Sequence, residues 1–370
     1  ALRGTVKRVV PRENEAINET WISDRDRFSY EGIYSDERLM SPMIKKDDQW
    51  QEISWKDALI EIVEKLKVVE NNSAAVLASP NSTLEEFYLL SRLSDELSIS
   101  NIDHRLRMVD FTDQLNDPKI PLLGINIAEI ENCKQIIVVG SDIRKEAPII
   151  GHRIRKAALS GAQIGIINEN INEYFFDVAV YLSESIIGNL LGLLSALNGE
   201  PPEEMRDIFK QIKPTKEQQK LAAILNSEDK KHFILGHLAI NHPYASAIRL
   251  LSAKIAELTG AVLGFITEGS NAAGGHLMGV LPHRGFAGSS REIIGHSISE
   301  ISENNLDLLL LFNAEPGKDI PNLSAEKLTD SLVIALTPYA TENYKTTADI
   351  MLPIGTFAET SGTYINCEER

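Results

Sequence analysis

The sequence predicts an α/β fold with open, Rossmann-like parallel or mixed sheets. Two observations support this class: short apolar runs typical of buried strands recur along the chain, and segments with helical spacing of apolar residues lie between most of them. Parallel strands require crossover connections, which helices usually supply. Because the chain has 370 residues, we expect two or three domains.

The first elements follow an aromatic and charged segment that extends to about residue 54 and predicts short strands and turns. Residues 55–70 carry apolar side chains at helical spacing, and residues 74–78 are typical of a short buried strand. Residues 82–98 predict a second helix, for which Ser82 or Thr83 is a candidate N-cap. This order begins the α/β alternation.

The middle of the chain contains a βαβ pattern: strand 135–140, a helix at about 147–160, and strand 163–168. In residues 200–231, which are polar and charged, we expect a peripheral helical insertion. Residues 269–290 are rich in Gly, Ser and Asn and predict a long loop, which in a compact domain is either functional or disordered. Further strands are predicted at 178–182, 233–236, 262–266, 308–312, 332–336, 349–352 and 362–366.

Charge and hydropathy exclude two classes of function. The formal net charge of −16 argues against binding to duplex nucleic acid, which depends on Lys and Arg contacts to phosphates. No apolar run approaches the ~20 residues that span a bilayer, so we expect no direct membrane insertion. The chain begins with Ala1 and stops at residue 370 without a tail, and we expect it to be an excerpt of a longer protein.

The two cysteines, Cys133 and Cys367, lie far apart, and neither belongs to a C-x-x-C motif. An iron–sulfur cluster normally requires four thiolates, so we expect no cluster in this segment and two core thiols instead. No His or Cys lies at metal-ligand spacing from His104, and we therefore expect no metal site.

Gly140, Ser141 and Asp142 are the first candidate site, because they follow a buried strand. The carboxyl ends of parallel strands face the crevice in which open α/β sheets bind ligands, and N–H groups there can hold phosphate. The full G-x-G-x-x-G pattern is absent. The alternative is a tight turn that needs glycine.

A second candidate is the glycine-rich segment with Gly274, Gly275, Arg284 and Gly285. Glycine allows a backbone to approach a ligand closely, and Arg284, with the neighbouring His283, could contact phosphate or carboxylate. The alternative is a surface loop that packs against a neighbouring domain.

The third candidate is the segment 103–110, in which charged and apolar residues alternate. It contains no nucleophile, and we expect Asp103, His104, Arg105 and Arg107 to form a structural network near a domain junction. The cationic stripe at 144–156 is interpreted as a solvated helix face.

Three stretches resemble the molybdopterin oxidoreductases. Residues 130–142, with Ile154 and Ala157, are similar to the family's first dinucleotide-pocket unit, and residues 311–316 are similar to its G-x-N-P turn. Residues 347–370 resemble the family stretch ADxxLP…E…GTxxN…R. The resemblance implies the fold of formate dehydrogenase and DMSO reductase, of which this chain would form part of domains I–III.

The N-terminal part is more specific. Residues 6–14, 18–19, 21–28 and 101–107 are similar to the large iron–sulfur subunit of bacterial NADH:quinone oxidoreductase, respiratory complex I. The resemblance covers essentially the whole chain. It implies three regions: 1–54, the end of a small β-rich domain associated with the clusters; 55–113 with 290–370, one α/β domain; and 114–289, an inserted Rossmann-like domain.

One departure from the enzymes of the family bears on activity. In catalytic relatives a Cys, selenocysteine, Ser or Asp shortly after a conserved Arg ligates molybdenum. Matching that Arg to Arg107 places the ligand position at or next to Val109, and neither Val109 nor Met108 is a suitable ligand. Asp110 is one residue out of register. The resemblance therefore implies a vestigial pterin or nucleotide pocket at Gly140–Asp142, Gly274, Gly275, Arg284 and Gly285.

We therefore expect a non-catalytic scaffold region of an electron-transfer subunit. The full subunit is expected to bind [2Fe-2S] and [4Fe-4S] clusters through residues absent here. Expected partners are the other peripheral-arm subunits, including the NADH-binding subunit, on the cytoplasmic side of the bacterial inner membrane. The alternatives are an active molybdopterin-dependent oxidoreductase, formate-dehydrogenase-like, and a nucleotide-binding module that uses the Gly140 crevice.

Overall fold

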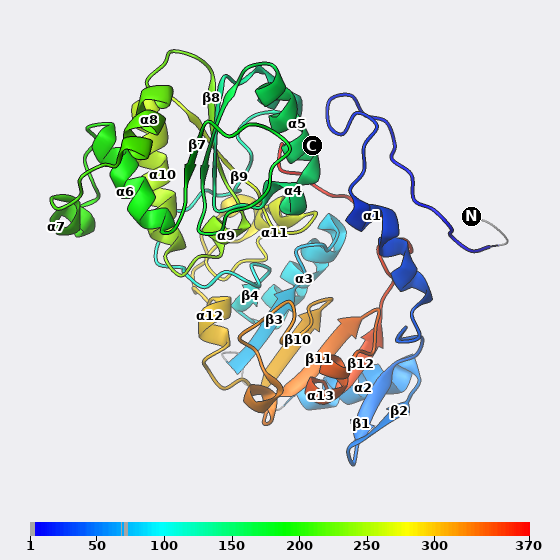
Figure 1. Cartoon of the computed structure of the whole chain (residues 1–370). Helices are drawn as coiled ribbons and strands as arrows, with labels where there is room; N and C mark the ends of the chain where they lie inside the picture. Colours follow the sequence, from blue (N-terminus) through cyan, green and yellow to red (C-terminus); the bar gives the residue numbers. More distant parts are fainter. Residues whose placement is uncertain (1–3, 68, 70–72) are drawn as a thin grey trace.

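Two sheets with helices on both faces organise the chain. The computed structural model describes residues 4–67, 69 and 73–370. In Figure 1 the smaller sheet lies above the larger one, and the N-terminal segment runs along the side of both. The α/β class with parallel and mixed sheets is confirmed.

The larger sheet has seven strands in the order β2-β1-β12-β11-β10-β3-β4. Neighbouring strands from β12 to β4 are parallel, whereas β1 is antiparallel to both β12 and β2. The strands are β1 (Met43–Lys46), β2 (Gln49–Glu52), β3 (Ala74–Ala78), β4 (Asn101–Asp103), β10 (Leu308–Phe312), β11 (Leu332–Thr337) and β12 (Ile350–Pro353).

The smaller sheet has five parallel strands in the order β7-β6-β5-β8-β9. All residues of its central strands β5 and β8 are buried, as both faces are covered by helices. The strands are β5 (Gln135–Val139), β6 (Gln163–Ile167), β7 (Val180–Leu182), β8 (Lys231–Leu235) and β9 (Val262–Phe265).

Helices pack on both faces of each sheet. Apolar side chains of α2 (Trp55–Leu66), α3 (Leu84–Glu96) and α11 (Ala272–Met278) pack on one face of the larger sheet. On its other face lie α12 (Ile298–Ile301), η6 (Ala325–Leu328) and α13 (Glu342–Thr347). The smaller sheet is covered by α6 (Ile186–Ala196), α8 (Lys216–Leu225) and α10 (Ala245–Thr259) on one face, and by η3 (Ile127–Asn132) and α5 (Pro148–Leu159) on the other.

Short helices complete the fold. Two of them, α4 (Ile143–Glu146) and α9 (His237–Ile240), directly follow β5 and β8 at the carboxyl edge of the smaller sheet. The others are α1 (Asp24–Phe28), η1 (Ser29–Tyr34), η4 (Glu203–Met205), α7 (Arg206–Phe209) and η5 (Phe286–Gly288). The residues before position 35, predicted as strands and turns, therefore contain helical segments.

Three predictions of local structure differ from the structure, and a fourth falls partly outside the described residues. Within 200–231, α8 buries Leu221 and Leu225 in the core of the smaller sheet, so this part is not a peripheral insertion. The predicted loop 269–290 contains the buried helix α11. Residues 362–366 are not a strand, because side chains of other segments bind their backbone groups. The end of the predicted helix 55–70 falls partly on residues 68 and 70, outside the described residues.

The predicted boundary at residue 54 also separates residues that the structure joins. Strands β1 and β2 belong to the larger sheet, since β1 pairs with β12 through Met43 and Ile44. The division of the chain into three domains remains a proposal, and the sheet pairing places residues 43–52 with the larger sheet.

The N-terminal segment is held against α5. Arg153, almost fully buried, donates to the carbonyls of Glu15 and Ile17 and forms an ion pair with Glu19 at 3.0 Å. Lys156 contacts Glu19 at 2.5 Å. The stripe interpreted as a solvated face is therefore partly a contact surface, which a net charge count could not reveal.

Candidate functional site

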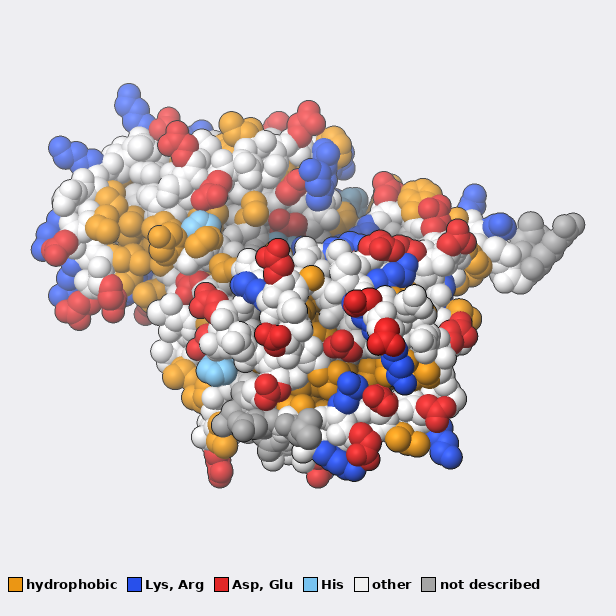
Figure 2. Space-filling model, turned by 90° about the horizontal axis from the view of Figure 1, so that it is seen from below, with side chains coloured by type: hydrophobic (Ala, Val, Ile, Leu, Met, Phe, Trp, Pro, Cys, Tyr) orange, Lys and Arg blue, Asp and Glu red, His pale blue; other side chains and the backbone are white. Residues whose placement is uncertain are grey.

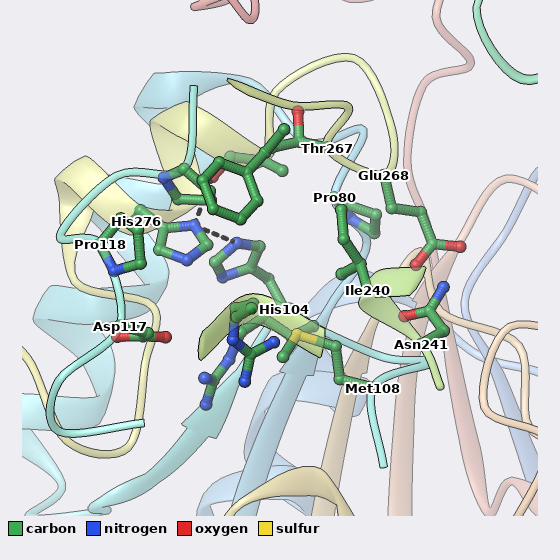
Figure 3. A pocket seen from close by; sticks show the side chains of 15 residues that line it. Pro80, His104, Met108, Asp117, Pro118, Ile240, Asn241, Thr267, Glu268 and His276 are labelled. Atoms are coloured by element: carbon green, nitrogen blue, oxygen red, sulfur yellow. Dashed lines mark hydrogen bonds between the residues drawn. The ribbon is translucent and has the colours of Figure 1, made fainter. Parts of the chain in front are cut away.

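A cavity of about 620 Å³, partly open to solvent, lies where the carboxyl ends of strands from both sheets meet (Figure 3). It is lined by residues that follow β3, β4 and β9, and by residues of α9, α10 and α11. Ligands in open α/β folds bind at such edges. The lining is Pro80, His104, Arg105, Met108, Asp117, Pro118, Pro121, Ile240, Asn241, Arg249, Phe265, Thr267, Glu268, Ala272 and His276.

A buried ion pair supports one wall of this cavity. Asp103 at the end of β4 accepts two hydrogen bonds from the Arg105 guanidinium, at 2.9 and 2.8 Å. Burial alone would raise the pKa of Asp103, but the adjacent Arg105 charge outweighs burial and holds this pKa below its ordinary value. The Arg105 guanidinium also stacks on Phe111, 4.7 Å from the ring centroid.

Arg107, the fourth predicted member of this network, lies apart from it. Its side chain is half exposed, and its Nε lies 3.1 Å from Glu268 Oε1 on the other side of the cavity mouth. Its Nη2 lies 3.7 Å from Asp319. Arg107 thus links loops of the two sheets instead of joining the buried pair. Burial raises the pKa of Glu268, although Arg107 opposes that effect.

His104 pairs with His276, which lies on α11. The Nδ1 atom of His104 is 2.8 Å from the carbonyl of Val280, and its Nε2 atom is 3.1 Å from Nδ1 of His276. Burial lowers the pKa of both imidazoles, so both are neutral at ordinary pH. A Cβ at position 275 would lie 2.8 Å from the His104 ring, so Gly275 makes this contact possible.

The predicted ligand position does not face the main cavity. Val109 lines a second hollow of about 390 Å³, which is also bounded by α12 and residues 320–322, whereas Met108 lines both spaces. The Asp110 carboxylate accepts hydrogen bonds from the backbone of Ser246 at 2.8 Å and from the backbone and hydroxyl of Thr112. Through the bond to Ser246, the Asp110 carboxylate holds the start of α10.

The turn at Gly140 is closed by the chain itself. Gly140 has a φ of +58°, and a Cβ there would lie 2.5 Å from the backbone nitrogen of Ala239. Its carbonyl accepts hydrogen bonds from the backbone of Leu238 and Ala239 in α9. Glycine is therefore required both for the backbone conformation and for the close packing of α9.

The N–H groups beside this turn are occupied by the carboxylate of Glu146. It accepts hydrogen bonds from the Ser141 hydroxyl at 2.6 Å, from the Asp142 backbone at 3.0 Å and from the His237 backbone at 3.1 Å. These donors lie at the starts of α4 and α9, where backbone N–H groups favour a negative charge. An internal anion thus lies where a phosphate group would be held.

The glycine-rich candidates likewise make internal contacts. A Cβ on Gly274 would lie 2.4 Å from the Asn271 side chain, and the Gly285 backbone donates to Ser289. Arg284 donates to three backbone carbonyls, of residues 115, 117 and 118, and pairs with Asp117 at 2.8 Å.

The predicted pocket residues therefore do not form one site. None of the seven lines the main cavity, and the residues around Gly140 do not fit a nucleotide phosphate, because Glu146 and α9 fill that position. Glu146, Glu268 and His276 were not predicted from the sequence. The sequence signal for Glu146 is an acidic residue four positions after Asp142, in the turn that follows a strand.

The described residues contain neither a metal-binding cluster nor a membrane-spanning helix. Across residues 4–67, 69 and 73–370, no group of three or more His, Cys, Asp and Glu side chains is arranged to hold a metal ion. Within the same residues, no helix combines the length and apolar composition needed to cross a bilayer.

Comparisons with known proteins agree on one family. The family model for molybdopterin oxidoreductase matches residues 38–370, and the model for the NADH-ubiquinone oxidoreductase NDSU1/NuoG-like 4Fe-4S domain matches residues 2–31. The chain is 34% identical over 164 residues to the NADH-quinone oxidoreductase G subunit of Rickettsia felis, covering 43% of this chain and 24% of that protein. It is 31% identical over 173 residues to the NADH-ubiquinone oxidoreductase 75 kDa subunit of Reclinomonas americana, covering 43% and 25%.

Solved structures share the fold at low identity. Acetylene hydratase from Pelobacter acetylenicus superposes with a TM-score of 0.61 at 12% identity, covering 93% of this chain and 59% of that one. The formyltransferase/hydrolase complex from Methylorubrum extorquens gives 0.62 at 14% identity, covering 89% and 91%. The chain spans about a quarter of the length of the curated relatives named above.

Proposed function

Because the chain belongs to the molybdopterin oxidoreductase family, we propose that it is a non-catalytic scaffold region of the large iron–sulfur subunit of NADH:quinone oxidoreductase. The resemblance inferred from sequence motifs is confirmed for the family and for the relatives of that large subunit. In the proposed role, this region supports electron transfer from NADH to quinone in the peripheral arm without an active site of its own.

The observation that carries this proposal is the Glu146 carboxylate bound by Ser141, Asp142 and His237. A charge-assisted set of hydrogen bonds of this kind is among the stronger polar interactions in proteins. A phosphate at this position would have to displace Glu146 and would meet its negative charge. We infer that the crevice serves the fold and not a nucleotide.

The predicted metal-ligand position supports the same proposal. Met108 lines the cavity, Val109 lines the second hollow, and the Asp110 carboxylate is bound to Thr112 and Ser246. A methionine thioether is not equivalent to a thiolate or carboxylate as a ligand of molybdenum.

The surface supports a role in assembly. Figure 2 shows acidic and basic side chains interspersed over one face and apolar side chains gathered on the part with the smaller sheet. Trp21, Phe28 and Tyr34 in the N-terminal segment are about half exposed. Aromatic residues are enriched at protein–protein interfaces. We propose that this segment contacts the cluster-bearing domain, and that other peripheral-arm subunits, the NADH-binding subunit among them, bind elsewhere.

Cofactors and location follow from the same proposal. The full subunit would bind [2Fe-2S] and [4Fe-4S] clusters through residues outside this chain, and the arm would lie on the cytoplasmic side of the bacterial inner membrane. The net charge of −16 disfavours nucleic acid as a partner.

The proposal is tested in the intact complex with Asp110→Ala and Met108→Leu. We expect NADH:quinone electron transfer at the wild-type rate in both, since neither side chain is assigned a redox role. Asp110→Asn serves as the control that keeps an acceptor for Ser246. A severe loss of activity in a normally assembled complex would contradict the scaffold role.

Metal analysis distinguishes the scaffold role from the alternative, an active molybdopterin-dependent oxidoreductase. The full-length protein is assayed for molybdenum and tungsten, and for pterin fluorescence after oxidation. Stoichiometric metal with pterin would favour the enzyme. The scaffold role predicts neither in stoichiometric amount.

A further inference from the structure

The cavity between the two sheets has the composition of a small-molecule site. The space of about 620 Å³ includes its open mouth, so the enclosed part suits only a small molecule. Most of the wall is apolar and consists of rigid or bulky groups: Pro80, Met108, Pro118, Pro121, Ile240, Phe265 and Ala272. A wall of this kind favours a compact apolar ligand.

The charged groups of the wall are already paired. Arg105 binds Asp103, Arg249 binds Asp113, and Asp117 binds Arg284. Glu268 at the mouth pairs with Arg107. Because each charge has a partner of opposite sign, the cavity offers no counter-charge to an ionic ligand, whose desolvation would be uncompensated. The lining therefore favours an uncharged ligand over an ionic one.

The two ring nitrogens of His276 in the cavity wall differ: Nδ1 has two hydrogen-bond partners, and Nε2 has none among the described residues. The Nδ1 atom of His276 lies 3.1 Å from His104 Nε2 and 3.0 Å from the carbonyl of Ala272. In Figure 3 the dashed lines meet at this one nitrogen of His276. Nε2 of His276 makes no hydrogen bond to any described residue. The His276 side chain lines the cavity, and only 5% of the residue is exposed.

The hydrogen bonds fix the tautomer of His276. A carbonyl can only accept, so Nδ1 of His104 carries a proton toward Val280. The neutral His104 ring then presents Nε2 as an acceptor, and Nδ1 of His276 must be the donor to it and to Ala272. A neutral imidazole has one proton, so Nε2 of His276 is left with a lone pair.

Three polar atoms of the lining residues are buried without a hydrogen bond in the described part of the chain. They are Nη1 of Arg105, Oδ1 of Asn241 and Oδ1 of Asp117, the last of which forms an ion pair with Arg284. A ligand that carries a hydroxyl group can both donate and accept, so these atoms do not oppose it. For Nε2 of His276, the surrounding hydrogen bonds determine that it is unprotonated and therefore an acceptor.

We propose that this cavity binds a small, uncharged, mainly apolar molecule that donates one O–H or N–H hydrogen bond to Nε2 of His276. A phenol-like ring with a single donor has this chemistry. The apolar body would pack against Phe265 and the prolines, and the donor would satisfy the unused acceptor of His276. The binding site is independent of the scaffold role, because it requires neither electron transfer nor a partner subunit.

The test uses phenol as the probe and anisole as its matched control, since methylation removes the donor while the ring is unchanged. Calorimetric titration and melting of the full chain are measured with each. We expect phenol to bind and to raise the melting temperature, and anisole to bind at least about tenfold more weakly, as expected for one lost hydrogen bond. Equal affinity for the two probes, or binding of neither, would overturn the proposal.

Variants of His276 locate the hydrogen bond. His276→Asn keeps a donor near the position of Nδ1 but removes Nε2, and we expect about tenfold weaker phenol binding. His276→Gln places an amide near the position of Nε2 and should restore most of the affinity. Ile240→Trp fills the cavity and should abolish binding of both probes. Phenol affinity unchanged in both His276→Asn and Ile240→Trp would show that phenol binds elsewhere and would overturn the proposal.

Discussion

Removal of the Glu146 carboxylate tests whether an internal anion replaces a bound phosphate. Glu146→Ala leaves three donors without their acceptor: the Ser141 hydroxyl and the backbone N–H groups of Asp142 and His237. A hydrogen bond to a charged group contributes about 1.5–3 kcal/mol, but Glu146 is partly exposed and water can replace part of the loss. We expect a loss of about 2–4 kcal/mol.

The assay is thermal unfolding with and without inorganic phosphate. For a cooperative unit of roughly 150–250 residues, about 2–4 °C is lost per kcal/mol, so the expected fall in melting temperature is about 4–16 °C. In the variant, phosphate should bind the vacated donors, and a concentration about ten times its Kd would restore about 1.4 kcal/mol. Chloride at matched ionic strength serves as the control for screening.

Two further variants separate the charge from the side chain. Glu146→Gln keeps the side-chain length and one acceptor oxygen. Its melting temperature should lie between those of the wild type and Glu146→Ala. Glu228→Ala removes the same charge from an exposed residue without these contacts, and it should change the melting temperature little. The reasoning is refuted if Glu146→Ala melts as the wild type does, or if phosphate stabilises the wild type as much as the variant.

Three further outcomes follow from the contacts described above. Arg153→Ala should release residues 14–19 and increase tryptic cleavage in the N-terminal segment about tenfold, measured by mass spectrometry over time. Asp103→Asn leaves the buried Arg105 charge unpaired and should lower the free energy of unfolding in urea by about 3–5 kcal/mol. Burial lowers the pKa of His232 to about 4, below the value near 6.5 in the unfolded chain, so the unfolded chain alone takes up the proton between these values. The wild type should therefore lose up to about 3 kcal/mol more than His232→Gln as the pH falls from about 6.5 to about 4, measured by urea unfolding at each pH.

Elements that were predicted well have a local cause. Strands β3 and β10 were predicted at their observed bounds, because short, nearly continuous apolar runs suit strands covered on both faces. Ser82 or Thr83 is the predicted N-cap of α3, and the structure shows Thr83 in a full capping box with Glu86. Such signals need no knowledge of distant residues.

Elements that were not predicted depend on distant residues. Helix α11 has two adjacent glycines, which disfavour a helix, but its small side chains allow close packing against α3 and His104. The pair of His104 and His276 joins residues 172 positions apart, so spacing along the chain gave no indication of it. The same holds for Arg153, whose partners lie in the N-terminal segment.

The candidate site shows why chemically suggestive residues do not by themselves form a ligand site. Gly140, Arg284 and Asp110 have the chemistry that phosphate or metal binding requires, and each uses it on the chain itself: on α9, on backbone carbonyls and on Ser246. An internal group is present at a fixed high effective concentration, so it competes strongly against a ligand in solution. A fold in which Gly140, Arg284 and Asp110 are engaged in this way gains no stability from a cofactor at these positions. Its folding is therefore expected to be independent of cofactor supply, as the proposed scaffold role requires.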